Sequence, residues 1–338
     1  MLDFEANQRE DRTFMTIAAV TTAFTLGFVL TLLATPQVKK LAAYCGAMDQ
    51  PDARKVHNTP MPLWGGLGVS LSATIAFLVA LFAVSGMTLS SKLMSGVIAT
   101  VFCSLAIMVV GMVDDRNGMG AKTKLTAQIA LSLILIGSGV KIDYFSLPFV
   151  DGVFYLGEWQ SLGISLLWLV GVTNAVNLLD GLDGLVAGVA CGSAVILALV
   201  AAVNGQWLPV LAMASLAGAA LGFLRYNFNP AQIFMGDTGS LFLGMMFASW
   251  SLLGYLKTTA TVALTVPILL VMAVPLLDTS FAIIRRGLAR QPIFKPDKGH
   301  LHHRLLSTGM SQKQAVVTIY VINTAFGLAG LALACVHN

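Results

Sequence analysis

Long apolar runs alternate with short polar segments along almost the whole chain. About ten runs are long enough to cross a bilayer, which takes about 20 apolar residues in a helix. They lie near residues 14–36, 64–86, 94–113, 125–142, 161–179, 184–203, 207–224, 240–256, 261–284 and 316–336. Helices are the expected spanning elements, because lipid offers no hydrogen-bond partners to an unpaired backbone. The pattern predicts an all-α polytopic membrane protein with about ten transmembrane helices.

The runs follow one another closely, which predicts a single integral-membrane domain, residues 14–338, after an external tail, residues 1–13. The first run is too long for a signal-peptide core and has no basic segment before it, so we expect it to be retained as a span. Residues 143–160 alternate apolar with small or polar residues around Asp151 and Gly152. This alternation is typical of a short β-hairpin, which we expect on the external side.

Composition supports a membrane setting. The chain is 57% hydrophobic and only 11% charged, whereas soluble domains carry about 25% charged residues. Its four cysteines are scattered and show neither a disulfide framework nor metal-ligand spacing. The net charge of +4 is explained by the distribution of basic residues between loops and does not call for nucleic acid as a partner.

The basic residues also predict orientation. With both termini outside, the cytoplasmic loops are 37–63, 114–124, 180–183, 225–239 and 285–315. These loops hold 15 of the 20 Lys and Arg residues, which is the bias expected of cytoplasmic loops. The same orientation places every unusual polar motif on the cytoplasmic side.

One polar cluster interrupts the apolar pattern between the fifth and sixth predicted spans. It consists of Asn174, Asn177, Asp180 and Asp183. Residues three apart lie on nearly the same face of a helix, so two amides and a carboxylate can point one way. Gly181 and Gly184 let the backbone turn close to a ligand. A helix cap would explain one of these residues but not all of them, so the segment predicts a ligand site.

Two further acidic motifs lie at predicted helix ends. Asp114 and Asp115 close the third span, where carboxylates are costly without a cation nearby. Two interpretations stay open: the pair binds a metal or acts as a general base, or it is a helix end that reaches water with Arg116, Lys122 and Lys124 as counter-ions. Gly236 and Asp237 open the eighth span, where helix amides can hold phosphate and the carboxylate can hold Mg²⁺. A plain helix cap is the alternative for Asp237.

The remaining candidates are basic or aromatic. His300, His302, His303 and Arg304 form one cluster. A zinc site is an alternative for these histidines, but the segment lacks Cys or Glu residues at the spacing of zinc ligands. Phosphate or sugar contacts and proton handling therefore explain the cluster better. Lys55 is either a phosphate contact or a positive-inside anchor, and Phe234 either stacks on a base or anchors the interface. Asp278 lies inside the ninth span, where we expect a supporting role.

The motifs together resemble one family. Asp-Asp at 114–115, NAVNLLDGLDGL at 174–185, FMGDTGSLFLG at 234–244 and HLHHR at 300–304 are similar in order and spacing to the polyprenyl-phosphate N-acetylhexosamine-1-phosphate transferases, the glycosyltransferase 4 or MraY–WecA–TagO superfamily. Members transfer a sugar 1-phosphate from a UDP-sugar to a membrane polyprenyl phosphate and release UMP. The resemblance implies ten or eleven helices around a cytoplasmic cleft that holds Mg²⁺, or Mn²⁺ in its place.

The resemblance also implies roles. The implied catalytic residues are Asp114, Asp115, Asp180, Asp183, His302 and His303. The implied substrate-binding residues are Lys55, Lys124, Asn174, Asn177, Asp180, Asp183, Phe234, Gly236, His300 and Arg304. Asp237 would coordinate magnesium with Asn177 beside it. Asp114 would deprotonate or orient the lipid phosphate, with Asp115 supporting it and Lys124 contacting that phosphate.

The separated histidines of HLHHR resemble the WecA/TagO branch, which uses UDP-N-acetylglucosamine, more than the phospho-MurNAc-pentapeptide transferases, which tend to carry three histidines in a row. The implied partners are UDP-GlcNAc and undecaprenyl phosphate in the bacterial plasma membrane. The implied product starts a cell-envelope polysaccharide, and a homodimer stays open. A transporter for an anionic metabolite is the alternative of another class, but it would place charges near the midplane and show internal repeats.

Overall fold

The computed structural model describes residues 2–51, 59–84, 90–145, 154–255, 269, 271–288 and 301–336. Its helices are α1 (Leu2–Cys45), α2 (Gly65–Ala83), α3 (Ser91–Asn117), α4 (Ala121–Gly137), α5 (Glu158–Leu178), α6 (Leu185–Val203), α7 (Trp207–Asn227), α8 (Gly236–Trp250) with the π-helical turn η1 (Ser251–Tyr255), α10 (Ala273–Leu288), α11 (Leu301–Ser307) and α12 (Gln312–Val336). The strands are β1 (Met48–Asp49), β2 (Met61–Pro62), β3 (Tyr144–Phe145) and β4 (Phe154–Tyr155).

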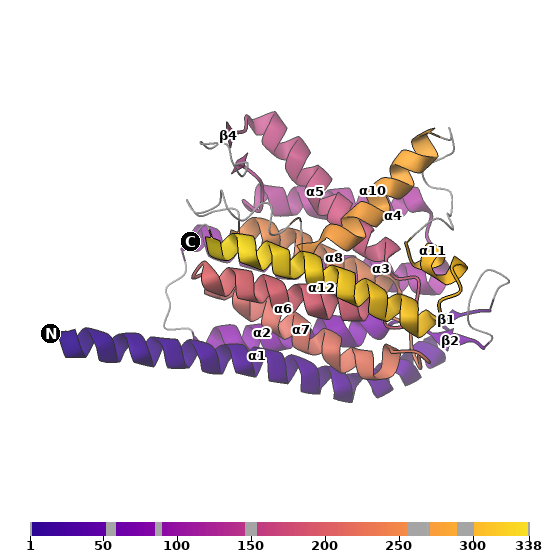
Figure 1. Ribbon diagram of the computed structural model, residues 1–338, viewed down its shortest axis with the longest axis horizontal. Coiled ribbons are helices and arrows are strands. Elements are labelled where there is room, and N and C mark those ends of the chain that lie inside the picture. The colour runs from indigo at the N-terminus through magenta and orange to yellow at the C-terminus, as the bar shows by residue number, and fades with distance from the viewer. Residues whose placement is uncertain are drawn as a thin grey trace.

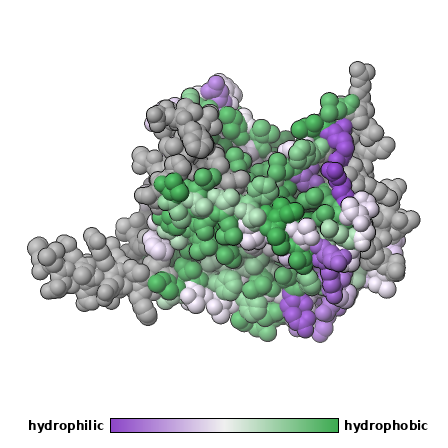
Figure 2. Space-filling view, viewed as in Figure 1, coloured by the Kyte–Doolittle hydropathy of each residue, from purple (hydrophilic) through white to green (hydrophobic). Residues whose placement is uncertain are grey.

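Seven of the described helices are long and apolar enough to cross a membrane. They are α1 from Ile17 onward, α2, α3, α5, α6, α7 and α12. Figure 2 shows apolar side chains spread over the middle of the visible face, with hydrophilic ones gathered mainly toward one end. The expected all-α polytopic membrane architecture is confirmed.

Three of the predicted spans do not correspond to helices that are as long and apolar as these seven. The count of ten spans therefore stays a prediction. The run at 125–142 corresponds to α4, which has 17 residues, and the run at 240–256 to α8 and η1. The run at 261–284 overlaps α10 and lies partly outside the described residues.

Small residues let α1 and α7 pack closely. Helices α1 and α7 lie side by side (Figure 1), and Gly218 and Gly222 of α7 meet the backbone of α1. A Cβ at Gly218 would lie 2.0 Å from the carbonyl oxygen of Phe24, and one at Gly222 would lie 2.6 Å from that of Phe28. Two glycines four residues apart are a common means of close helix contact in membranes.

Helix α8 lies at the centre of the bundle. Its residues from Thr238 to Trp250 are buried, and it packs against α2, α3 and α5. The contacts with α2 and α3 require glycine: a Cβ at Gly66 would lie 2.0 Å from Gly239 Cα, and a Cβ at Gly111 would lie 2.4 Å from the carbonyl oxygen of Asp237. The start of α8 is therefore held between the start of α2 and the end of α3.

The two ends of the bundle differ. The first residues of α1 and the last of α12 lie at one end, and α11, β1 and β2 lie at the other (Figure 1). Strand β1 pairs antiparallel with β2. Strand β3 pairs antiparallel with β4, within the range predicted to form a hairpin, but the intervening residues 146–153 lie outside the described residues. The complete hairpin stays a prediction.

Four of the five predicted cytoplasmic loops are partly helical, namely 37–63, 114–124, 225–239 and 285–315, and the first two illustrate the reason. Helix α1 continues to Cys45, so Lys39 and Lys40 of the predicted loop 37–63 lie in its last turns. Helix α3 continues to Asn117, so Asp114 and Asp115 are helical residues. A helix can extend beyond the apolar segment that crosses the lipid, which explains both differences.

Candidate active site

The polar motifs meet around a hollow of about 790 Å³ at the α11 end of the bundle. Its walls come from the segment before α2, the end of α3, the α5–α6 and α7–α8 connections, α11 and the start of α12. The lining residues are Asp49, Thr59, Met61, Leu63, Asp114, Asp115, Gly118, Asp180, Gly181, Leu182, Asp183, Asn227, Asn229, Pro230, Ala231, Phe234, Gly236, Asp237, His303 and Gln312. Eight predicted site residues are among them.

A lysine and two carboxylates form the centre of this site. The ammonium of Lys124, at the start of α4, forms ion pairs with Asp114 Oδ2 and Asp237 Oδ2. The three side chains are only 12–25% exposed, so water screens their charges less than at a free surface. Acidic groups from two distant chain segments therefore converge on one cation.

Asn177 extends this centre. Its Nδ2 donates to Asp237 Oδ1 at 2.9 Å and to Ser240 Oγ at 2.8 Å. The predicted proximity of Asn177 and Asp237 is thus observed. Asn174 faces elsewhere: its Nδ2 donates to Gln128 Oε1 at 2.5 Å and to the Val170 carbonyl at 2.8 Å. The two amides do not point at one partner, and Asn174 is absent from the lining of the hollow.

Asp115 contacts the backbone of α8. Its Oδ1 accepts the N–H of Asp237 at 2.8 Å, and its Oδ2 accepts the N–H and hydroxyl of Thr238 at 3.1 and 2.6 Å. These are free amides of a helix start, which a carboxylate satisfies well. We expected Asp115 to support its neighbour Asp114, but these contacts support the segment that carries Asp237.

Gly236 makes this arrangement possible. Its φ is +71°, a region that glycine enters without steric cost. A Cβ there would also lie 2.3 Å from Asp115 Oδ2. The resemblance implied Gly236 as a substrate contact, and it lies in the wall of the hollow. Its backbone N–H donates to the carboxylate of Asp180.

The two aspartates of the α5–α6 connection have different environments. Removal from water, together with the negative charges of Asp237 and Asp115, raises the pKa of Asp180 well above its ordinary value. Asp183 lies among hydrogen-bond donors: its Oδ2 accepts Asn229 Nδ2 at 2.9 Å and the Ala231 N–H at 3.1 Å. Asp180 therefore faces the acidic centre, and Asp183 faces the α7–α8 connection.

Several lining residues were not predicted. Asn229 Nδ2 also donates to Gln312 Oε1 at 2.7 Å, which connects Asp183 to the start of α12. Asn227 is 3% exposed; its Oδ1 accepts the Gly184 N–H at 3.1 Å and its Nδ2 donates to the Ile233 carbonyl at 2.9 Å. The two asparagines stand close together in the sequence just before the α8 motif, which was the available signal. Gln312 offered none.

The basic cluster is divided by the structure. His302 is 3% exposed and packs against Gly181, where a Cβ would lie 2.5 Å from its Nε2. The ring of His303 packs against that of His302 at a tilt of 44°, with centroids 4.3 Å apart, and His303 lines the hollow. Arg304 is exposed on α11 and does not line it. Lys55 and His300 lie outside the described residues.

Asp278, for which a pairing with Arg285, Arg286 or a ligand residue is the prediction, contacts the start of α11. Its Oδ1 accepts the N–H of Leu301 at 2.8 Å. The carboxylate thereby connects α10 to the first residue of α11, the helix that carries His302 and His303.

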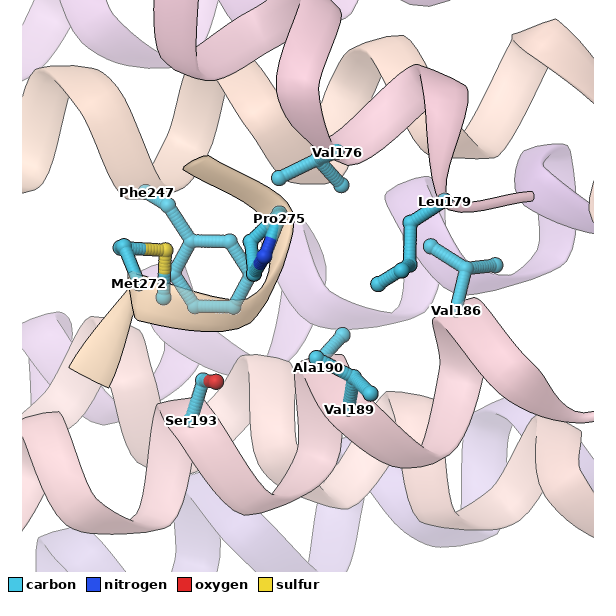
Figure 3. Close-up of a pocket in the computed structure, with 9 residues that line it drawn as sticks. All are labelled: Val176, Leu179, Val186, Val189, Ala190, Ser193, Phe247, Met272 and Pro275. Carbon is cyan, nitrogen blue, oxygen red and sulfur yellow. The ribbon is translucent and has the colours of Figure 1, made fainter. Parts of the chain in front are cut away.

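A smaller pocket lies next to the site but offers little chemistry. Figure 3 shows it between the end of α5, the start of α6, α8 and the start of α10. Its lining residues are Val176, Leu179, Val186, Val189, Ala190, Ser193, Phe247, Met272 and Pro275. Ser193 is the only one of these nine with a polar side-chain group, so the polar hollow is the candidate active site.

The carboxylate oxygens of the site suit a magnesium ion whose other ligands would be phosphate oxygens and water. No group of three His, Cys, Asp or Glu side chains at metal-binding distance occurs among the described residues. Mg²⁺ commonly takes one or two carboxylates together with phosphate oxygens and water. The position between Asp114 and Asp237 already attracts a positive charge, the Lys124 ammonium. Oxygen ligands of this kind suit Mg²⁺ better than zinc.

Comparison with known proteins agrees with this geometry. The model of glycosyl transferase family 4 matches residues 97–255, which span α3 to η1. The probable undecaprenyl-phosphate N-acetylglucosaminyl 1-phosphate transferase of Bacillus subtilis strain 168 is 40% identical over 93% of this chain and 85% of its own length. The decaprenyl-phosphate N-acetylglucosaminephosphotransferase of Mycobacterium tuberculosis H37Rv is 38% identical over 89% of this chain and 80% of its own.

A third relative is more distant. The phospho-N-acetylmuramoyl-pentapeptide-transferase of Staphylococcus aureus strain JH9 is 30% identical over 91% of this chain and 96% of its own length. Fold and site together define a polytopic membrane protein with an acidic, lysine-bridged centre at one end of its helical bundle. The chain belongs to glycosyl transferase family 4, within the polyprenyl-phosphate N-acetylhexosamine-1-phosphate transferases.

Proposed function

We propose that the protein transfers N-acetylglucosamine 1-phosphate from UDP-GlcNAc to undecaprenyl phosphate. The products are undecaprenyl-diphospho-GlcNAc, which starts a cell-envelope polysaccharide, and UMP. The lysine-bridged pair Asp114–Asp237 in a hollow beside apolar helices carries this proposal. The names of the more similar relatives support the sugar and the lipid carrier.

The reaction is a displacement at phosphorus. An oxygen of the lipid phosphate attacks the β-phosphorus of UDP-GlcNAc, and the bond from that phosphorus to the bridging oxygen breaks as UMP leaves. Phosphoryl transfer depends mainly on positioning and charge neutralisation. Asp237, with Asn177 beside it, would hold Mg²⁺, which when bound neutralises the diphosphate.

The side chains around this position have separate tasks. Asp114 lies against Lys124 and would orient or deprotonate the lipid phosphate, while Lys124 would attract it. The α5–α6 connection, with Asp180 and Asp183, would line the uridine and diphosphate side. His303, in the same wall, would contact phosphate or sugar. The protein thus brings two anions together with fixed positive charge.

The site would face the cytoplasm of a bacterial plasma membrane, where UDP-sugars are made. The excess of basic residues in the predicted cytoplasmic loops supports this orientation. Helices α4, α8 with η1, and the segment ending in α10 would complete ten spans. Both termini would then lie outside, with the β3–β4 hairpin, at the end opposite the site.

Transfer of phospho-MurNAc-pentapeptide is the second candidate, which the S. aureus relative represents at lower identity. A transporter is less well supported, because the charged centre lies at one end of the bundle, in a hollow lined by the connections between helices.

A substrate panel tests the proposal. Purified protein would be incubated with undecaprenyl phosphate, Mg²⁺ and one of UDP-GlcNAc, UDP-GalNAc, UDP-glucose or UDP-MurNAc-pentapeptide, and UMP would be measured. We expect UMP with UDP-GlcNAc, dependent on both the lipid and Mg²⁺. Release only with UDP-MurNAc-pentapeptide would favour the second candidate, and no release with any sugar would overturn the proposed activity.

A further inference from the structure

Trp64 has an unusual backbone conformation. It precedes α2 with φ +68° and ψ +11°, and among the described residues it is the only non-glycine residue with positive φ. A bulky side chain rarely occupies this left-handed region, because its Cβ crowds the backbone. Two glycines, Gly65 and Gly66, follow directly and would adopt the conformation more easily. A strained residue at this place calls for an explanation in its contacts.

The indole of Trp64 reaches the end of α3. Its Nε1–H donates to the carbonyl oxygen of Met112 at 3.1 Å, and the residue is 6% exposed. Met112 lies two positions before Asp114 and three before Asp115. The contact therefore holds the turn of α3 that presents both carboxylates.

The backbone around Trp64 reaches the segment before α8. The N–H groups of Gly65 and Gly66 donate to the carbonyls of Phe234 and Met235 at 3.0 and 2.9 Å, and the N–H of Phe234 donates to the carbonyl of Pro62 at 2.9 Å. These bonds fix the chain just ahead of Asp237. One residue thus binds α3 through its side chain, while its neighbours bind the start of α8 through their backbone.

We propose that Trp64 is a positioning residue for the transfer reaction. It holds the last turn of α3 in register with the first turn of α8, so that Asp114 and Asp237 face the same Lys124 ammonium. The left-handed backbone at residue 64 is what lets its indole face α3 while the following amides face α8. This role rests on the proposed function, because it acts through residues assigned to that reaction.

Trp168 provides a matched control. It lies on α5, and its Nε1–H donates to Ser251 Oγ at 2.9 Å and to the Ala248 carbonyl at 3.3 Å, at the end of α8 remote from Asp237. Trp168→Phe removes the same kind of hydrogen bond between two helices as Trp64→Phe. A purely structural role for the indole N–H predicts similar losses in both variants.

The experiment compares UMP release by wild type, Trp64→Phe and Trp168→Phe. We expect kcat of Trp64→Phe to fall by about tenfold or more, because small misplacements of reacting groups are costly, and KM for UDP-GlcNAc to stay within about twofold. We expect Trp168→Phe to keep kcat within about twofold. Melting temperatures of the two variants should agree within about 3 °C.

Should Trp64→Phe fail to fold, benzothienylalanine at position 64 keeps the bicyclic ring and removes only the N–H donor, and the same loss of kcat is expected. Wild-type kcat in a folded donor-deleted variant at position 64 would overturn the proposal, as would equal losses in both phenylalanine variants. An inactive wild type would instead overturn the proposed function, and the role of Trp64 with it.

Discussion

Asp115 Oδ1 accepts the backbone N–H of Asp237 at 2.8 Å, although the two residues are 122 positions apart in the chain. The other oxygen of Asp115 accepts two donors of Thr238. Of the two adjacent aspartates at the end of α3, Asp114 pairs with Lys124 in the wall of the hollow, and Asp115 binds the first turn of α8. Two residues that look equivalent in the sequence therefore make different contacts.

Asp115→Asn tests this division. Asparagine keeps only one of the two side-chain oxygens that accept these hydrogen bonds. Its NH₂ group would face the N–H of Asp237 or the N–H and hydroxyl of Thr238. We expect the free energy of unfolding to fall by about 1–3 kcal/mol and UMP release to fall about tenfold or more through displacement of Asp237. Asp143→Asn is the control, since Asp143 is half-exposed in its pair with Lys141 and should cost at most about 1 kcal/mol. Unchanged stability in Asp115→Asn would contradict the capping role.

Gly111→Ala tests the contact between α3 and α8. The new Cβ would lie 2.4 Å from the Asp237 carbonyl oxygen and 2.5 Å from the Thr238 nitrogen, and both are backbone atoms that cannot rotate away. We expect a loss of about 1–3 kcal/mol in unfolding free energy, together with loss of activity. Gly171→Ala, where a Cβ meets nothing within 4 Å, should be neutral or stabilising by up to about 1 kcal/mol. Equal melting temperatures for the two variants would argue against this packing.

Lys124→Met tests the cation between the carboxylates. Removing it leaves Asp114 and Asp237 facing each other without their shared partner, and an unpaired partly buried charge is destabilising. We expect turnover to fall by about 100-fold and the melting temperature to drop. Lys122→Met, which removes an exposed lysine two positions earlier, should leave both nearly unchanged. Similar turnover in the two methionine variants would mean that Lys124 is not part of the centre.

Gln312→Ala tests the connection from Asp183 through Asn229 to α12. With this bond removed, Asn229 and Asp183 lose part of their restraint, so KM for UDP-GlcNAc should rise several-fold while kcat changes less. Gln314 is the matched residue: its Oε1 accepts the N–H and hydroxyl of Ser311 at 2.9 and 3.0 Å and thereby caps α12. Gln314→Ala should lower stability by about 1 kcal/mol and leave KM unchanged. A raised KM in Gln314→Ala with an unchanged KM in Gln312→Ala would show that Gln312 does not support the substrate-binding wall.

The membrane architecture and the acidic centre could be predicted from the sequence for physical reasons. A bilayer requires long apolar helices, so α2, α6 and α7 stand out as uninterrupted runs. Charged and amide residues at the ends of such runs are costly unless they are used. Asp114, Asn177 and Asp237 meet this criterion, and the structure brings them together.

What could not be predicted depends on contacts between distant segments. Spacing alone suggested that Asn174 and Asn177 share a face, but each amide is directed by its partner, Gln128 in one case and Asp237 in the other. Asp115 gave no sign that its partners are backbone amides of α8. Neither Trp64 nor Gln312 shows in the sequence which residues it contacts, because their partners Met112 and Asn229 lie 48 and 83 positions away.

Asp237→Asn tests the central claim most directly. The substitution keeps the shape of the side chain and removes the charge that would hold Mg²⁺ and pairs with Lys124. Mg²⁺-dependent release of UMP from UDP-GlcNAc and undecaprenyl phosphate should fall by at least about 1,000-fold, while the melting temperature shows a folded protein. Wild-type turnover with an unchanged Mg²⁺ dependence in this variant would contradict the assignment of the centre.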